Sequence, residues 1–183
     1  MRVIAGRFKG RRLFVPPKGV RPTSDRVRES LFSVLGGVLQ GKRVLDLFAG
    51  SGSLGIEAMS RGAVEATFVD RSRTSMNALE RNLAPLKSPQ IEVRLYQKRA
   101  SAYVVNDWAG EDYDLVFLDP PYGDPDGDLC LKRIVELRSG QFGKLVFEAS
   151  SRDLPPVPEG LEIERQLEFG DTTVLILSEG GKP

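Results

Sequence analysis

Hydrophobic and polar positions follow two different periods along the chain, and these periods predict where strands and helices lie. Short apolar runs rich in Val, Leu and Phe predict buried strands at residues 43–48, 65–70, 91–95, 113–118 and 144–148. Between them, apolar residues recur at helical spacing and predict helices at residues 54–60, 72–83, 100–108 and 129–138. Strands that alternate with helices indicate right-handed crossovers and a mostly parallel α/β sheet with helices on both faces.

The two ends of the chain depart from this alternation. Near the N-terminus, residues 3–5 and 13–15 predict a small β-hairpin, residues 16–19 a loop and residues 24–35 a helix. Near the C-terminus, residues 161–168 and 172–177 are strand-like, and the gap between them is too short for a crossover helix, so this pair is antiparallel. We expect residues 1–40 to form an N-terminal extension and residues 41–183 the α/β domain, as one compact unit.

The composition of the chain narrows its chemistry. One cysteine, Cys130, and no histidine exclude an internal disulfide and a Ser-His or Cys-His nucleophile, and they leave a zinc site almost without ligands. The 183 residues fit one domain, and no stretch approaches the roughly 18 apolar residues that cross a bilayer. Because the first residues also lack the apolar core of a signal peptide, we expect a cytoplasmic protein with no metal ion and no membrane partner.

Charge is distributed unevenly along the chain. The overall net charge is +1, but residues 1–43 carry a net charge of +9 and the remaining residues −8. A basic terminal segment is typical of proteins that meet a polyanion such as RNA, because Lys and Arg neutralise phosphates. The candidate phosphate contacts are Arg7, Lys9, Arg11, Arg12 and Arg21. A solvated basic face is the alternative, and Arg21 could instead cover a cofactor.

A glycine-rich turn follows the first strand of the α/β domain. Glycine lets a ligand approach the backbone closely, and ligands of open α/β sheets bind beyond the carboxyl ends of the strands. Asp46, Ala49, Gly50 and Gly52 are therefore candidate cofactor residues. The spacing of Gly50, Gly52 and Gly55 also fits a dinucleotide such as NAD. However, Asp46 would repel a pyrophosphate, whereas it suits a sulfonium ligand that carries an amino group. A purely structural turn is the remaining alternative.

Asp70 ends the second strand of the domain and is followed by Arg71. A carboxylate at this strand tip can accept hydrogen bonds from both ribose hydroxyls of an adenosyl group. We therefore count Asp70 and Arg71 among the candidate cofactor residues. The alternative is an aspartate that caps a helix or is solvated.

An Asp-Pro-Pro-Tyr motif follows the fourth strand, at residues 119–122. The two prolines stiffen the chain and remove two N–H donors, which frees the carbonyl oxygen of Pro120 to face a ligand. That oxygen and the Asp119 carboxylate could hold the two hydrogens of an exocyclic amine on a base, and so favour the nucleophilic nitrogen that develops in the transition state. Tyr122 offers a flat face for the base, so Asp119, Pro120 and Tyr122 are the candidate catalytic residues. An ordinary turn is the alternative.

Residues 46–52, Asp70 and residues 119–122 resemble motif I, the ribose-binding acid and the Asn/Asp-Pro-Pro-Tyr/Phe motif of class I amino-methyltransferases. Residues 2–13 and 21–32 further resemble the RsmD family, which methylates a guanine N2 in the 16S RNA of the bacterial small ribosomal subunit. The resemblance extends to Glu148 and residues 169–172. It implies a Rossmann-like sheet of seven strands with an antiparallel last strand, and S-adenosylmethionine as cofactor. It also implies ribosomal RNA, within an assembled or assembling subunit, as partner of a monomeric enzyme.

One position departs from the family pattern. Where the family often has an acidic or amide residue that contacts adenine, this chain has Arg99 before Ala100, and both remain candidate cofactor residues. Three other functions stay open: an amine methyltransferase for DNA or another RNA, an NAD-dependent oxidoreductase, and an RNA-binding module without catalysis. A DNA enzyme usually needs a separate target-recognition region, for which this chain has no room.

Overall fold

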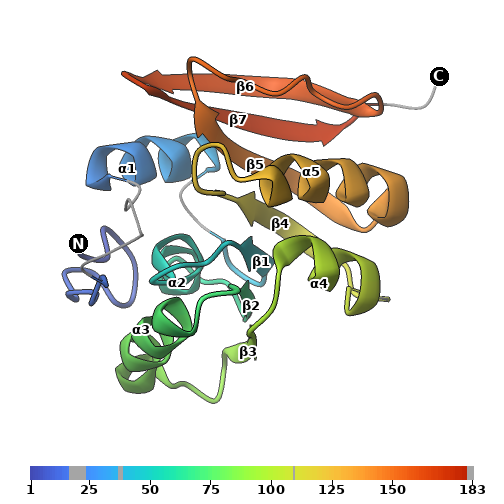
Figure 1. Cartoon of the computed structure of the whole chain (residues 1–183). Coiled ribbons are helices and arrows are strands. Elements are labelled where there is room, and N and C mark those ends of the chain that lie inside the picture. The colour runs from blue at the N-terminus through green and yellow to red at the C-terminus, as the bar shows by residue number, and fades with distance from the viewer. Residues whose placement is uncertain (17–23, 37–38, 109, 181–183) are drawn as a thin grey trace.

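The computed structural model describes residues 1–16, 24–36, 39–108 and 110–180. Its centre is a seven-stranded sheet with the strand order β3-β2-β1-β4-β5-β7-β6 (Figure 1). All neighbours pair in parallel except β7, which is antiparallel to both β5 and β6. The strands are β1 Arg43–Leu47, β2 Glu65–Val69, β3 Glu92–Tyr96, β4 Tyr113–Leu118, β5 Phe142–Ser150, β6 Leu161–Phe169 and β7 Thr172–Glu179. The predicted Rossmann-like sheet with an antiparallel last strand is thereby confirmed.

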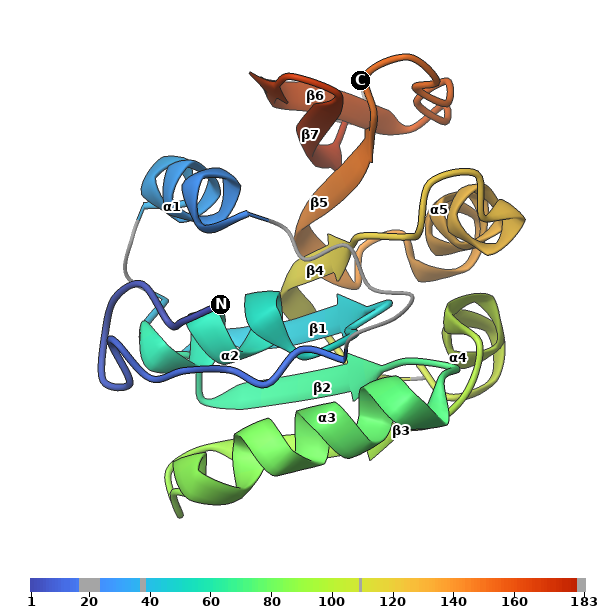
Figure 2. The same cartoon turned by 60° about the vertical axis from the view of Figure 1, so that its left-hand side comes forward.

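Helices cover both faces of this sheet, as predicted. Helices α1, α2 and α3 lie on one face, and α4 and α5 on the other (Figures 1 and 2). Within the described ranges, no helix combines the length and the apolar character needed to cross a membrane. The helices are α1 Asp25–Val34, α2 Ser53–Ser60, α3 Arg73–Leu83, α4 Ala100–Asn106 and α5 Pro125–Arg138, with a short 3₁₀ turn η1 Ala84–Leu86 after α3.

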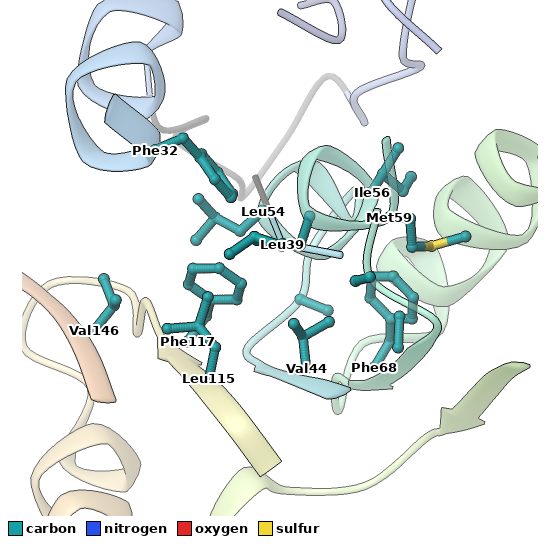
Figure 3. Close-up of a cluster of buried hydrophobic side chains, with 14 of the residues drawn as sticks. Phe32, Leu39, Val44, Leu54, Ile56, Met59, Phe68, Leu115, Phe117 and Val146 are labelled. Carbon is teal, nitrogen blue, oxygen red and sulfur yellow. The ribbon is translucent and has the colours of Figure 1, made fainter. Parts of the chain in front are cut away.

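The larger apolar core lies between the sheet and helices α1 to α3. Figure 3 shows Phe32 of α1 and Leu54 of α2 directed toward Phe117 of β4, while Phe68 of β2 packs beside Met59. All five side chains are buried. Removing a side chain of this size from water stabilises the folded state by about 1.5–3 kcal/mol. The central strands are buried on both faces, which explains why their sequences are continuous apolar runs.

The predicted N-terminal hairpin forms as a short antiparallel pairing without regular strands. Arg2 and Arg12 form an isolated bridge, and the N–H groups of Val3 and Leu13 donate to the carbonyl oxygens of Arg11 and Met1, at 2.9 and 3.1 Å. The backbone N–H groups of Ile4 and Ala5 donate instead to the carboxylate of Glu57 on α2, at 2.7 and 3.1 Å. The hairpin pairing therefore ends after Val3, and the next two residues pair with a helix side chain.

Two element boundaries also differ from the prediction. Helix α5 begins at Pro125, four residues before the predicted start at 129, because the Asp124 side chain caps it and proline fits the first turn. Strand β5 extends beyond 144–148 to residues 142–150, where it pairs with β4 and β7. The loop predicted at 16–19 lies outside the described residues from 17 onward.

Candidate functional site

A crevice of about 410 Å³ opens at the carboxyl ends of β1, β2 and β4. This volume falls in the range of small-molecule sites, and the position is where open α/β sheets bind ligands. Eight of the residues predicted from the sequence line the crevice together: Ala49, Gly50, Asp70, Arg71, Ala100, Asp119, Pro120 and Tyr122. Asp46, Gly52 and Arg99 are not part of its wall.

The glycine turn between β1 and α2 is held in an unusual backbone conformation. Phe48 has a φ of 64°, in the left-handed region that non-glycine residues rarely adopt. Phe48 also lines the crevice. Phe48 was not among the residues predicted from the sequence. A Cβ on Gly52, whose φ is 81°, would come within 2.3 Å of Leu79 on α3. The positive φ and this close approach to Leu79 both favour glycine at position 52.

Asp46 lies beneath this turn and is almost fully buried, with 2% of its surface exposed. Its carboxylate accepts a hydrogen bond from the N–H of Gly55 at 2.9 Å, which ties β1 to the first turn of α2. Burial raises the pKa of Asp46 to about 8, and the charges of Asp119 and Asp70 act in the same direction. The Asp46 carboxylate therefore lies under the turn and outside the crevice wall, whereas we had expected it to contact a ligand amine directly.

Asp70 stands at the rim of the crevice with a fixed orientation. One carboxylate oxygen accepts from the N–H of Gly50 at 2.8 Å and the other from the N–H of Ser72 at 2.7 Å. Each oxygen keeps a further lone pair, so the group can still accept from a ligand hydroxyl. The neighbouring Arg71 forms an ion pair with Asp124 at 2.9 Å, which connects the loops after β2 and β4.

The Asp-Pro-Pro-Tyr segment lies directly opposite, after β4. Asp119 is partly buried, and Tyr122 is 40% exposed in the crevice wall. The Tyr122 hydroxyl is hydrogen-bonded to Oγ1 of Thr172 at the start of β7, at 2.7 Å. This bond fixes the ring at the mouth of the crevice. Glu148 of β5, named earlier only through the family resemblance, lines the same cavity.

Asp126 is a crevice residue that the sequence did not predict. It lies in the first turn of α5, and the hydroxyl of Ser101 on α4 donates to its Oδ1 at 2.5 Å. Arg99, by contrast, is exposed and stands just before α4. The sequence signal that could have identified Asp126 is the Asp124-Pro125 pair, which is typical of a helix start. The predicted helix began at residue 129 and did not include it.

The basic N-terminal segment runs from the far end of α2 to the crevice. Arg7, Lys9, Arg11 and Arg12 are all exposed, whereas Arg21 lies outside the described residues. The Asn82 side chain on α3 accepts from the N–H of Phe14 at 2.8 Å and donates to the carbonyl oxygens of Phe14 and Ser51, both at 2.9 Å. This clamp leads the chain to Pro16, which is buried in the crevice wall.

No group of three or more His, Cys, Asp or Glu side chains in the described part of the chain could hold a metal ion. The residues that meet at the crevice are therefore carboxylates, backbone groups, an aromatic ring and an Arg–Asp ion pair. Such a set can orient a ribose and hold an amine.

Comparison with known proteins gives consistent matches. The family described as "Conserved hypothetical protein 95" matches residues 1–178. Ribosomal RNA small subunit methyltransferase D of Escherichia coli K12 is 42% identical over 123 residues, which cover 67% of this chain but only 60% of the relative. The protein of the same name from Haemophilus influenzae is 33% identical over 172 residues, covering 93% of this chain and 89% of the relative.

A solved structure agrees with these matches. The candidate methyltransferase yhhF from Escherichia coli superposes with a TM-score of 0.84 at 32% identity, covering 100% of this chain and 99% of that chain. The similarity therefore includes the N-terminal segment as well as the sheet.

Proposed function

The chain belongs to the RsmD family, and from this premise and the geometry of the crevice we propose that it is an S-adenosylmethionine-dependent methyltransferase of ribosomal RNA. Its target is the exocyclic N2 amine of a guanine in the small-subunit (16S) RNA. The observation that carries the proposal is the meeting of Asp119, Pro120 and Tyr122 with Asp70 and Gly50 in one crevice. An amine-binding motif and a nucleoside-binding strand tip then face the same cavity.

The residues of the crevice fit the cofactor. Asp126 lines the wall, and its buried Oδ2 has no hydrogen-bond partner among the described residues, so a ligand donor would satisfy it. Asp70 would hold the ribose hydroxyls, and the backbone at Ala49 and Gly50 would lie along the ligand. Ala100 would contribute an apolar wall. When bound, the cofactor supplies an electrophilic methyl group on a sulfonium.

The catalytic work of the protein consists of holding the amine. The lone pair of an exocyclic amine is delocalised into the base, so the nitrogen is a weak nucleophile. Acceptors at the Asp119 carboxylate and the Pro120 carbonyl would favour the pyramidal nitrogen over the planar one. They would therefore stabilise the transition state more than the ground state and so lower the barrier. Tyr122, fixed by Thr172, would stack on the base and align it.

The N-terminal segment supplies a second contact with the RNA in this proposal. Its exposed side chains would neutralise phosphates at a distance from the target base. In this proposal the enzyme acts as a monomer in the cytosol, on assembled or assembling small subunits.

Methyl transfer from labelled cofactor to three substrates tests the proposed function. We expect label in small-subunit particles or free ribosomal RNA, and mass spectrometry of the nucleosides to find N2-methylguanosine. Label on naked DNA alone would contradict the proposal. So would tight NADH binding without binding of S-adenosylmethionine. If Asp119→Ala left every activity unchanged, the chain would be an RNA-binding module.

A further inference from the structure

Asp126 has one satisfied and one unsatisfied carboxylate oxygen. The residue is 97% buried, since only 3% of its surface is exposed. Its Oδ1 accepts from Ser101, but its Oδ2 has no hydrogen-bond partner among the described residues. A buried acceptor without a donor costs free energy, and native proteins seldom retain one without a reason. Asp126 also lines the crevice, so we infer that a donor on a bound ligand completes the hydrogen bonding of this carboxylate.

The position of Asp126 identifies the part of the ligand that would reach it. Asp70, the proposed ribose partner, stands at the tip of β2. Ala100 follows the next strand along the edge, and Ser101 beside it holds Asp126. A base attached to a ribose at Asp70 would therefore extend toward the wall formed by Ala100 and Asp126.

The side chain at position 99, where the family often has a residue that contacts adenine, cannot accept this hydrogen bond. Arg99 is exposed, outside the crevice wall, and it carries donors without any acceptor. Adenine presents a donor at its 6-amino group, and a carboxylate oxygen is a strong acceptor for it. Oδ2 lacks a donor and the 6-amino group needs an acceptor, so the two groups are complementary.

We propose that Oδ2 of Asp126 accepts a hydrogen bond from the 6-amino group of the adenine ring, and that this contact selects adenosyl ligands. The inference rests on the proposed function and deepens it by naming a residue that determines cofactor specificity. In this chain the acceptor comes from α5, after β4, and takes the place of the residue that precedes Ala100.

The test compares two ligands and three proteins by isothermal titration calorimetry. The ligands are S-adenosylhomocysteine and its 6-deamino analogue, in which purine replaces adenine. The proteins are the wild type, Asp126→Ala and the control Ser101→Ala, which removes the bond between α4 and α5 but leaves Oδ2 in place. We expect the wild type to prefer the adenosyl ligand about tenfold or more, because a charged acceptor loses its donor in the analogue.

The outcomes separate this contact from a structural role. We expect Asp126→Ala to bind both ligands equally, with unchanged affinity for the 6-deamino analogue, and Ser101→Ala to keep the preference. Equal weakening of both ligands by Asp126→Ala would mean that Asp126 only ties the helices together, and it would overturn the proposal. If the wild type bound neither ligand, the proposed function itself would fail. If all three proteins kept the same preference, only the role of Asp126 would fail.

Discussion

At the scale of single residues, three carboxylates near the glycine turn differ through their surroundings. Asp46 is buried under the turn and accepts from one backbone N–H, whereas Asp70 is partly exposed and accepts from two. Asp119 is partly exposed in the crevice wall. The same side chain therefore fixes a turn at Asp46, whereas in the proposed function it would receive the ligand at Asp70 and meet the substrate at Asp119, according to its burial and donors.

The role of Asp119 predicts a large effect on rate and a small one on cofactor binding. Asp119→Ala should lower kcat for methyl transfer by about 10²–10³-fold, because one acceptor in the transition state is lost. The Kd for S-adenosylhomocysteine should change by less than about threefold. Single-turnover kinetics and calorimetry measure the two quantities. Asp112→Ala, an exposed aspartate just before β4, is the matched control. Equal losses in kcat and affinity would contradict the assigned role.

Asp46 predicts a pH-dependent stability. Its folded pKa of about 8 lies above the value near 3.8 of a free aspartate, so folding favours the protonated form. The stability that this form contributes is complete below about pH 4 and is lost as the pH rises toward 8. Asp46→Asn, which stays neutral and can still accept from Gly55, should therefore gain stability over the wild type as the pH rises from 5 to 8. Urea unfolding without ligand measures this, and a difference independent of pH would contradict it.

Sequence patterns located the residues that stand within a strand tip or a local motif. Asp70 and Asp119 could be predicted because each directly follows an apolar strand. Asp126 could not, because its burial depends on a contact with Ser101, 25 residues away. The left-handed conformation of Phe48 has no local sequence signal either, since only the packed turn imposes it.

At the scale of elements, the strands and helices of the domain were predicted almost throughout because their periods are strong. The N-terminal hairpin is shorter than predicted, for a reason that local patterns do not contain. Glu57, from the middle of α2, takes the N–H groups of Ile4 and Ala5, and β-prone residues then lie in an irregular segment. Arg28 of α1 is also buried beside Glu57, at 3.8 Å, and donates to the carbonyl oxygen of Arg2. Three elements thus meet around one carboxylate.

The Asn82 clamp predicts a coupling between the N-terminal segment and the crevice. Asn82→Ala should destabilise the protein by about 1–3 kcal/mol, because backbone groups of Phe14 and Ser51 lose their partners. It should also weaken binding of S-adenosylhomocysteine, since Pro16 would no longer be held in the wall. Denaturant unfolding and calorimetry measure both effects. Asn106→Ala, which removes an exposed amide that donates to Ala102, is the control and should change neither.

The basic segment predicts a salt-dependent contact with RNA. Arg11→Ala with Arg12→Ala should weaken RNA binding and reduce the slope of log K against log salt by about one to two, because two phosphate contacts are lost. Both side chains are exposed, and the guanidinium of Arg11 contacts only the carbonyl oxygen of Pro85 in the described structure, at 3.3 Å. Lys132→Ala with Arg133→Ala on α5 removes the same charge from the other face. An unchanged slope in the N-terminal variant would contradict the contact.

At the scale of the whole molecule, the turn of the basic segment that carries Arg7 and Lys9 lies at the opposite end of α2 from the crevice. Gly6 is packed against Ser60 at the last turn of this helix, while the glycine turn precedes its first residue. Eight residues of helix span about 12 Å. An RNA that placed its target base at Tyr122 would therefore meet Arg7 and Lys9 away from that base. In the proposed function this separation would let phosphate contacts position the RNA while the crevice reads the base.

The same arrangement predicts that the N-terminal segment and the sheet unfold together. Val3 and Leu13 are buried in the core that includes α1, α2, β4 and β7, so the segment loses its apolar contacts only if that core opens. Trp108, the one tryptophan, is buried in the other core, between the sheet and helices α4 and α5. Its fluorescence should therefore follow the same urea transition as far-UV circular dichroism.

Native-state hydrogen exchange supplies the second probe. The Val3 amide, which donates to the carbonyl oxygen of Arg11 at 2.9 Å, should exchange with nearly the global free energy of unfolding. The amide of Asp153, in the exposed loop after β5, is the internal control and should exchange through local opening at a much lower free energy. If the Val3 amide exchanged as easily as that of Asp153, the N-terminal segment would open independently of the sheet. The segment could then no longer hold Pro16 in the crevice wall.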